Sequence, residues 1–149
     1  MSRTGLDARG EDLFLALGEE TEAALGAGGV GIWRWRVEGE ALEWSRNLER
    51  IHDLPQGTFD GTFHSFARDI HEDDLDAVFA AVQTAVSTGG TYEVCYRNRP
   101  LGDAEAIWIE ARGGIVVGSD GHRYLTGICQ NATERIEAGR QLQRRLAQQ

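Results

Sequence analysis

Residues 32–37 read Ile-Trp-Arg-Trp-Arg-Val, so large apolar side chains alternate with charged ones. Successive side chains of a β-strand point to opposite faces, and this period of two therefore predicts a strand. Trp33 and Trp35 would share one face of it, while Arg34 and Arg36 would share the other. A face that carries two tryptophans has to be buried, so the chain must supply further strands and helices to cover it.

The remaining elements are predicted from periodicity and turn residues. Glu38-Gly39 is a turn signal that folds the next run back into a hairpin, and Ser119-Asp120-Gly121 is a second one. The strands expected after the first are residues 41–45, 91–99, 106–117 and 123–130. The expected helices are residues 11–25, several short ones within 47–70, a longer one over 73–87 that stops at Gly89-Gly90, and a polar one over 134–149.

This order of elements predicts an α+β domain. Its core would be a five-stranded antiparallel sheet with helices on one face, and flanking helices would lie at both ends of the chain. A chain of 149 residues fits one such domain. We expect an N-terminal amphipathic flanking helix within residues 1–28, the core domain over 29–133 and a C-terminal linker helix over 134–149.

The chain is acidic, with 24 Asp and Glu residues against 15 basic ones and a formal net charge of -9. Such a field repels nucleic acids and anionic membrane surfaces. The alternation in the first strand also separates the tryptophans from the arginines, so the two kinds of residue cannot form one surface that stacks bases and binds phosphates. We therefore expect no nucleic-acid partner and no direct membrane contact.

The two cysteines, Cys95 and Cys129, lie in expected strands and have no second cysteine or histidine at metal-ligand spacing. Alternation places Cys129 on the inner face of the last strand together with Leu125, and Cys95 on the outer face of its own strand. A buried cysteine most often serves as a small apolar residue. The cysteines thus indicate neither a disulfide framework nor a metal site, and they fit a reducing compartment such as the cytoplasm.

Five segments, in this order along the chain, resemble the PAS family of sensory domains. They are residues 31–37, 42–59, 70–97, 108–113 and 127–135. The resemblance is to the bacterial variety with a tryptophan-rich first strand and a His-x-Asp-Asp motif before the long helix, here His71-Glu72-Asp73-Asp74. It extends over about residues 31–135, and it implies the PAS fold more directly than any one activity.

The resemblance implies a sensory or regulatory module of a bacterial signal-transduction protein. A small ligand or partner would change the conformation of the domain, and the C-terminal helix would carry that change to an effector in the same polypeptide. The effector would be a histidine kinase, as in two-component systems, a phosphatase or a cyclic-dinucleotide enzyme, and the domain itself is expected not to be an enzyme. The module would form a homodimer through its N-terminal helix and the outer face of the sheet.

Two further expectations concern particular residues. Asn131 and Thr133 stand where the family has its Asp-Ile-Thr motif, and by resemblance we expect them to relay the signal. The inner sheet face would line a ligand-binding interior, for which the candidate residues are Trp35, Phe66, Phe79, Val82, Tyr92, Val94, Tyr96, Ile109, Leu125 and Cys129. We expect no resident cofactor, although an unknown small molecule would fit there. The long helix offers no histidine for haem, and residues 63–68 lack the cysteine that binds flavin covalently in light-sensing relatives.

Other interpretations stay open. The same fold would also serve as a ligand-free scaffold for dimerisation or interaction. A small enzyme with a curved α+β fold would use Asp53, Asp60 or His64 as a base, but the sequence has no nucleophile motif and no phosphate-binding glycine loop. The acidic cluster at residues 71–74 is interpreted as a cap for the helix that follows and not as a metal site, because neighbours in sequence cannot all converge on one ion.

Overall fold

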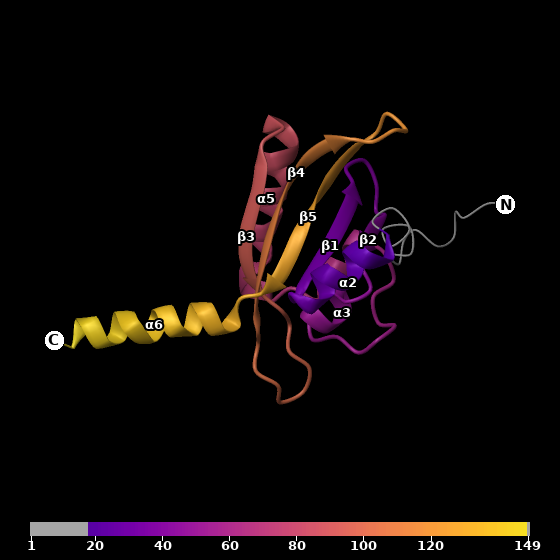
Figure 1. Cartoon of the computed structure of the whole chain (residues 1–149). Helices are drawn as coiled ribbons and strands as arrows, with labels where there is room; N and C mark the ends of the chain where they lie inside the picture. The colour runs from indigo at the N-terminus through magenta and orange to yellow at the C-terminus, as the bar shows by residue number, and fades with distance from the viewer. Residues whose placement is uncertain (1–17, 149) are drawn as a thin grey trace.

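The computed structural model describes residues 18–148 of the chain. The strands are β1 (Val30–Arg36), β2 (Leu42–Trp44), β3 (Thr91–Arg97), β4 (Trp108–Val117) and β5 (Arg123–Asn131). The helices are α2 (Glu19–Ala27), α3 (Leu48–Ile51), α4 (Phe63–Arg68), α5 (Leu75–Thr88), which follows a 3-10 turn at Glu72–Asp74, and α6 (Thr133–Ala147). The strands form one antiparallel sheet in the order β2-β1-β5-β4-β3 (Figure 1). The predicted fold class is confirmed.

The first hairpin separates apolar from charged side chains as its sequence predicts. Trp33 lies opposite Trp44 in the β1–β2 register, and both line the interior of the domain. Arg34 lies on the outer face, where its Nε donates to Glu43 Oε1 at 2.6 Å and its guanidinium lies 5.0 Å from the centre of the Tyr124 ring. The sheet backbone therefore stands between the tryptophans and the arginines.

Two glycines let β4 and β5 approach each other closely at the middle of the sheet. Gly127 of β5 is paired with Trp33 on one side and with Gly113 on the other. A Cβ atom on Gly127 would run into the Arg112 carbonyl oxygen, and one on Gly113 would run into that of Thr126. A Cβ atom on Gly113 would also lie 2.9 Å from the Trp33 ring. The indole therefore packs directly against the bare backbone of the neighbouring strands.

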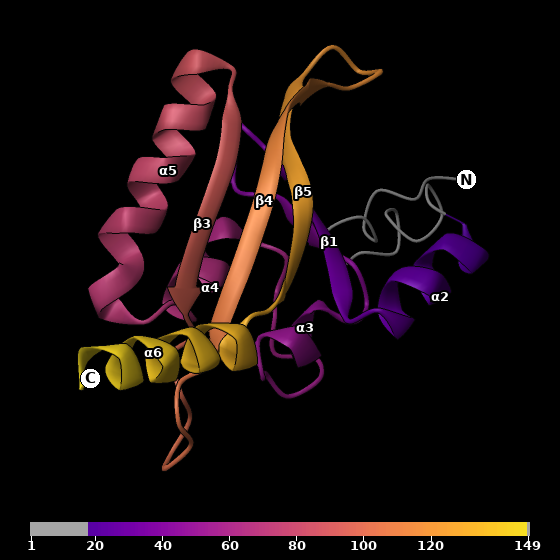
Figure 2. The ribbon, with the colours of Figure 1, turned by 60° about the vertical axis from the view of Figure 1, so that its left-hand side comes forward.

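Helix α5 lies alongside β3 and covers the inner face of the sheet (Figure 2). Its buried side chains, Val78, Val82 and Ala85, are spaced by four and three residues and form one apolar stripe. Gly89 follows the last turn with φ of +70°, a left-handed conformation that glycine adopts without strain. The predicted end of this helix is confirmed.

The acidic cluster before α5 differs in part from our prediction. The cap comes from His71, whose Nδ1 accepts a hydrogen bond from the Asp73 N–H at 3.1 Å. Asp74 does not cap the helix; its carboxylate accepts one backbone and two guanidinium hydrogen bonds from Arg97 of β3, at 2.8 to 2.9 Å. These bonds hold the pKa of Asp74 below its usual range, and a bidentate charged pair is stronger than a helix-end contact. Within residues 18–148, no metal-binding cluster forms.

The terminal helices begin at other residues than predicted. Gly18 has φ of +86° and ψ of 154°, which an α-helix does not accommodate, so the single helix expected over residues 11–25 is wrong and α2 begins at Glu19. Residues 11–17 lie outside the described residues. At the other end, α6 begins at Thr133, one residue before the predicted start. In the described part of the chain, no helix has the length and apolar character needed to cross a membrane.

We predict that Gly113→Ala lowers the free energy of unfolding by about 2 to 3 kcal/mol, because the new methyl group would press against the Thr126 carbonyl and the Trp33 ring. Gly114→Ala is the matched control, since it lies next along β4 and a Cβ atom there meets nothing within 4 Å. Urea denaturation of the two variants measures the difference. Equal stability of the two would contradict the close packing of β4 on β5.

Candidate functional site

The inner sheet face and the helices enclose a small cavity. Its volume is about 30 Å³, which is room for about one or two water molecules. The lining residues are Trp33, Trp35, Leu42, Trp44, His52, Phe63, Phe66, Val82, Tyr92, Tyr96, Ala111, Leu125 and Cys129. Aromatic side chains from three strands (β1, β2 and β3) and two helical segments meet here. They fill nearly all of the interior.

Seven of the ten predicted lining residues border this cavity. They are Trp35, Phe66, Val82, Tyr92, Tyr96, Leu125 and Cys129. Phe79 does not, because it lies beside the buried stripe of α5, where it is 38% exposed and stacks on Phe63. Val94 is half-buried against the core, and Ile109 is fully buried among other core side chains. These three residues support the wall and do not form it.

Six lining residues are absent from the sequence prediction: Trp33, Leu42, Trp44, His52, Phe63 and Ala111. The strand residues among them follow from the same alternation that selects Trp35, so the sequence carries the signal for them. His52 and Phe63 belong to short helical segments after β2. Segments of four to six residues have no period long enough to define a buried face, and the sequence gives no comparable signal for these two.

His52 is a fully buried part of the cavity wall. Its ring stacks on Trp44 with centroids 4.6 Å apart, and Trp44 stacks in turn on Phe59 at 3.7 Å. The His52 Nδ1–H donates to the Leu48 carbonyl at 3.1 Å, and the His52 Nε2 accepts from the Tyr96 hydroxyl at 2.8 Å. Burial lowers the pKa of His52 from 6.5 to about 4, so the ring is neutral at pH 7.

The other polar groups of the wall are also uncharged. Trp33 Nε1 is buried and has no hydrogen-bond partner in the part of the chain that the structure describes. Burial raises the pKa of the Cys129 thiol and of the Tyr92 hydroxyl. A wall of neutral groups suits a neutral occupant and supplies no reactive thiolate. Cys95 is exposed on the outer face, where alternation predicts it.

The three candidate bases of the enzyme interpretation lie outside the cavity. Asp60 accepts hydrogen bonds from the Thr62 hydroxyl and N–H at 2.7 and 3.1 Å, and the hydroxyl contact lowers its pKa. Asp53 ends the α3 segment with φ of +59°, and His64 is exposed on α4. None of these three side chains lines the cavity.

Asn131 and Thr133 lie at the junction where β5 passes into α6. The Asn131 Oδ1 atom accepts from the Thr133 N–H at 2.9 Å, so the uncharged amide caps the first turn of the helix. Thr133 Oγ1 accepts from the Trp108 N–H at 2.9 Å, and the Ala132 N–H donates to the Trp108 carbonyl at 2.8 Å. The start of α6 is thus hydrogen-bonded to both backbone groups of the first residue in β4.

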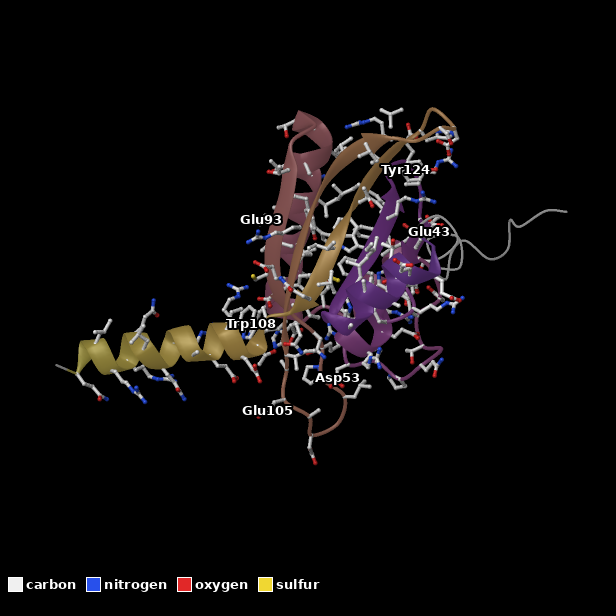
Figure 3. The ribbon with its side chains drawn as sticks, in the orientation of Figure 1. Glu43, Asp53, Glu93, Glu105, Trp108 and Tyr124 are labelled. Carbon is white, nitrogen blue, oxygen red and sulfur yellow. The ribbon has the colours of Figure 1, made fainter. Side chains whose placement is uncertain are left out.

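Trp108, labelled in Figure 3 near the start of α6, also contacts other elements through its ring. The guanidinium carbons of Arg97 and Arg140 lie 5.2 and 5.1 Å from its centre, a distance at which a cation is attracted to the ring face. Arg97 is in turn held by Asp74 at the beginning of α5. A continuous series of contacts therefore runs from α5 through β3 and β4 to α6.

The fold and the site together define a class of small α+β domains. In this class, a five-stranded antiparallel sheet and its covering helices enclose a central cavity, and the last strand runs into an exposed helix. The family profile described as the PAS fold matches residues 41–129, more than half of the chain. The chain belongs to the PAS family.

Solved structures with this fold include domains of bacterial signalling proteins. One is a sensory box histidine kinase/response regulator from Burkholderia thailandensis E264, with a TM-score of 0.69 and 24% identity over 87% of this chain and 97% of that one. Another is the N-terminal domain of a diguanylate cyclase with PAS/PAC sensor from Marinobacter aquaeolei, with a TM-score of 0.60 and 20% identity over 71% and 97%. The comparison with curated proteins finds no match. Likeness at these identities shows the fold alone.

We predict that the stability difference between the wild type and His52→Gln depends on pH. The lowered pKa of His52 contributes stability that is complete above pH 6.5 and is lost as the pH falls toward 4. The difference should therefore shrink by roughly 3 kcal/mol over this interval. Urea denaturation at a series of pH values measures it, with the exposed His64→Gln as control. A difference that stays constant with pH would contradict the neutral, buried ring.

Proposed function

We propose that the chain is a sensory or regulatory PAS module of a bacterial signal-transduction protein, and that α6 passes its conformational change to an effector in the same polypeptide. The observation that carries this proposal is the attachment of α6. Its first residues are hydrogen-bonded to Trp108 at the end of the sheet, while its remaining turns extend away from the domain (Figure 1). A helix fixed in this way moves when β4 moves.

Side-chain contacts reinforce the attachment over the first two turns of α6. Arg135 Nη2 lies 3.3 Å from Glu110 Oε2, and Arg140 lies over the Trp108 ring. Beyond these turns the helix has no buried side chain, and Leu142 and Leu146 are 57% and 59% exposed. Leucines four residues apart suit packing against a second helix. This exposed pair supports a partner helix from a second copy or from the effector.

The proposed assembly is a homodimer that uses the N-terminal helix and the outer sheet face. Helix α2 contacts β1, and Ile128 is 37% exposed in the middle of the outer face.

The similar domains from a histidine kinase/response regulator and a diguanylate cyclase support an effector such as a kinase, a phosphatase or a cyclic-dinucleotide enzyme in cis. The net charge of -9 argues against nucleic acid as a partner, and two free cysteines suit the cytoplasm.

The stimulus in this proposal is a small neutral ligand or a protein partner that prefers one of two sheet conformations. A ligand-free scaffold is the second candidate, and the cavity volume of about 30 Å³ favours it. Native mass spectrometry of the purified chain distinguishes the two. A molecule that co-purifies at near-equal stoichiometry supports ligand sensing, and its repeated absence supports the scaffold.

We predict that Thr133→Val loosens α6 without unfolding the domain. The variant keeps the shape of the side chain but removes the acceptor of the Trp108 N–H. Loss of one hydrogen bond of about 1 kcal/mol should speed amide hydrogen exchange at Trp108 and in the first two turns of α6 by about fivefold. The thermal midpoint should fall by only a few degrees.

Gln141→Ala is the control for this experiment, because Gln141 is exposed on the same helix. It should leave hydrogen exchange at Trp108 unchanged. If Thr133→Val also leaves exchange in α6 and at Trp108 unchanged, α6 is not held by this junction and the proposed relay is wrong.

A further inference from the structure

Asp69 is a buried carboxylate outside the cavity. It follows the last turn of α4 and is only 8% exposed. Its Oδ2 atom is buried and accepts no hydrogen bond within residues 18–148. A buried ionised carboxylate without a donor is costly, so this side chain is stable only while it holds its proton or after a donor moves to it.

A donor lies beside it but is bonded elsewhere. The Arg99 N–H donates to the Asp69 carbonyl at 2.6 Å, which places the two residues against each other. The Arg99 guanidinium, however, donates through Nε to the Arg68 carbonyl at 3.0 Å and through Nη2 to the Ile70 carbonyl at 3.1 Å. The Arg99 guanidinium therefore caps the end of α4, while Oδ2 of Asp69, the residue between those two carbonyls, accepts no hydrogen bond in the described part of the chain.

The titratable and charged groups that act on Asp69 come from three elements. Asp53 lies at the end of the α3 segment, Tyr96 lies on β3, and Arg99 lies in the connection from β3 to β4. Burial raises the pKa of Asp69 to about 7, Arg99 opposes this increase, and the like charge of Asp53 adds to it. The carboxyl group thus changes its charge near neutral pH.

We propose that Asp69 and Arg99 form a proton-operated switch at the base of the domain. In the protonated state, the Arg99 guanidinium caps α4 as the structure shows. When the Asp69 carboxyl releases its proton to solvent, the guanidinium leaves the Arg68 and Ile70 carbonyls and pairs with the carboxylate. The switch has two discrete arrangements of one side chain, and it rests on the proposed function because it supplies that function with a signal.

The connection that carries Arg99 leads directly to α6. The preceding residue is Asn98, whose backbone N–H donates to the Ile107 carbonyl at 3.1 Å and whose Oδ1 accepts from the Ile107 N–H at 2.8 Å. Ile107 is followed by Trp108, whose N–H donates to Thr133 Oγ1. Figure 3 shows Trp108 and Asp53 toward the same end of the sheet. Movement of Arg99 is therefore transmitted through two adjacent backbone positions to the first turn of α6.

Proton–nitrogen NMR spectra of the full chain between pH 5.5 and 8.5 test this proposal. The amide resonances of Arg99, Ile107, Trp108 and Thr133 should shift together with one midpoint near pH 7. Asp69→Asn should abolish the common step, because the amide cannot ionise. Asp53→Asn is the matched control, and it should keep the step but move its midpoint to lower pH, because it removes a neighbouring negative charge.

Three results would overturn the switch. A common step that persists in Asp69→Asn would come from a histidine. If the Arg99 amide resonance shifts with pH but those of Trp108 and Thr133 do not, the response to protonation is limited to the loop and the switch is wrong. The attachment of α6 is tested separately, by hydrogen exchange in Thr133→Val. If Asp69→Asn does not fold, Arg99→Gln replaces it; this variant should raise the midpoint and remove the response of Thr133, and an unchanged Thr133 response would contradict the proposal.

Discussion

The close approach of β4 and β5 at Gly113 and Gly127 is the constraint on which the rest of the domain depends. Because neither residue has a side chain, the Trp33 indole lies against the backbone of the central strands and fills the middle of the inner face. Tyr92 meets this ring edge-on, with centroids 5.4 Å apart. The interior is therefore closed by aromatic rings, and only about 30 Å³ remains open.

The same pair of strands positions the C-terminal helix. Their ladder continues without interruption to the pair Ile109 and Asn131. The hydrogen bond from the Ala132 N–H to the Trp108 carbonyl adds the next rung, and α6 begins one residue later. The helix is thus a direct extension of the sheet, and any change in twist or register of β4 against β5 must displace it. This geometry, more than the cavity, supports the proposed connection of the domain to an effector.

Much of the fold could be predicted from the sequence, because alternation in a half-buried strand specifies both the strand and its buried face. That rule predicts all five strands and most of the cavity wall, and the order of the elements, read together with five sequence motifs, resembles the PAS family. It does not predict His52, since short helices lack a usable period. It also cannot predict that Asp74 bonds Arg97 or that Arg99 lies beside Asp69, because these contacts join residues that only the folded chain brings together.

The central claim is that α6 is rigidly continuous with β4 and β5. Residual dipolar couplings of backbone N–H groups, measured on the full chain in a weakly aligning medium, report the orientation of each element directly. The account predicts that residues 133–140 fit the same alignment tensor, with the same magnitude, as residues 108–117 and 123–131. Couplings of α6 that require a separate tensor of reduced magnitude would show a helix that reorients freely, and they would contradict the account.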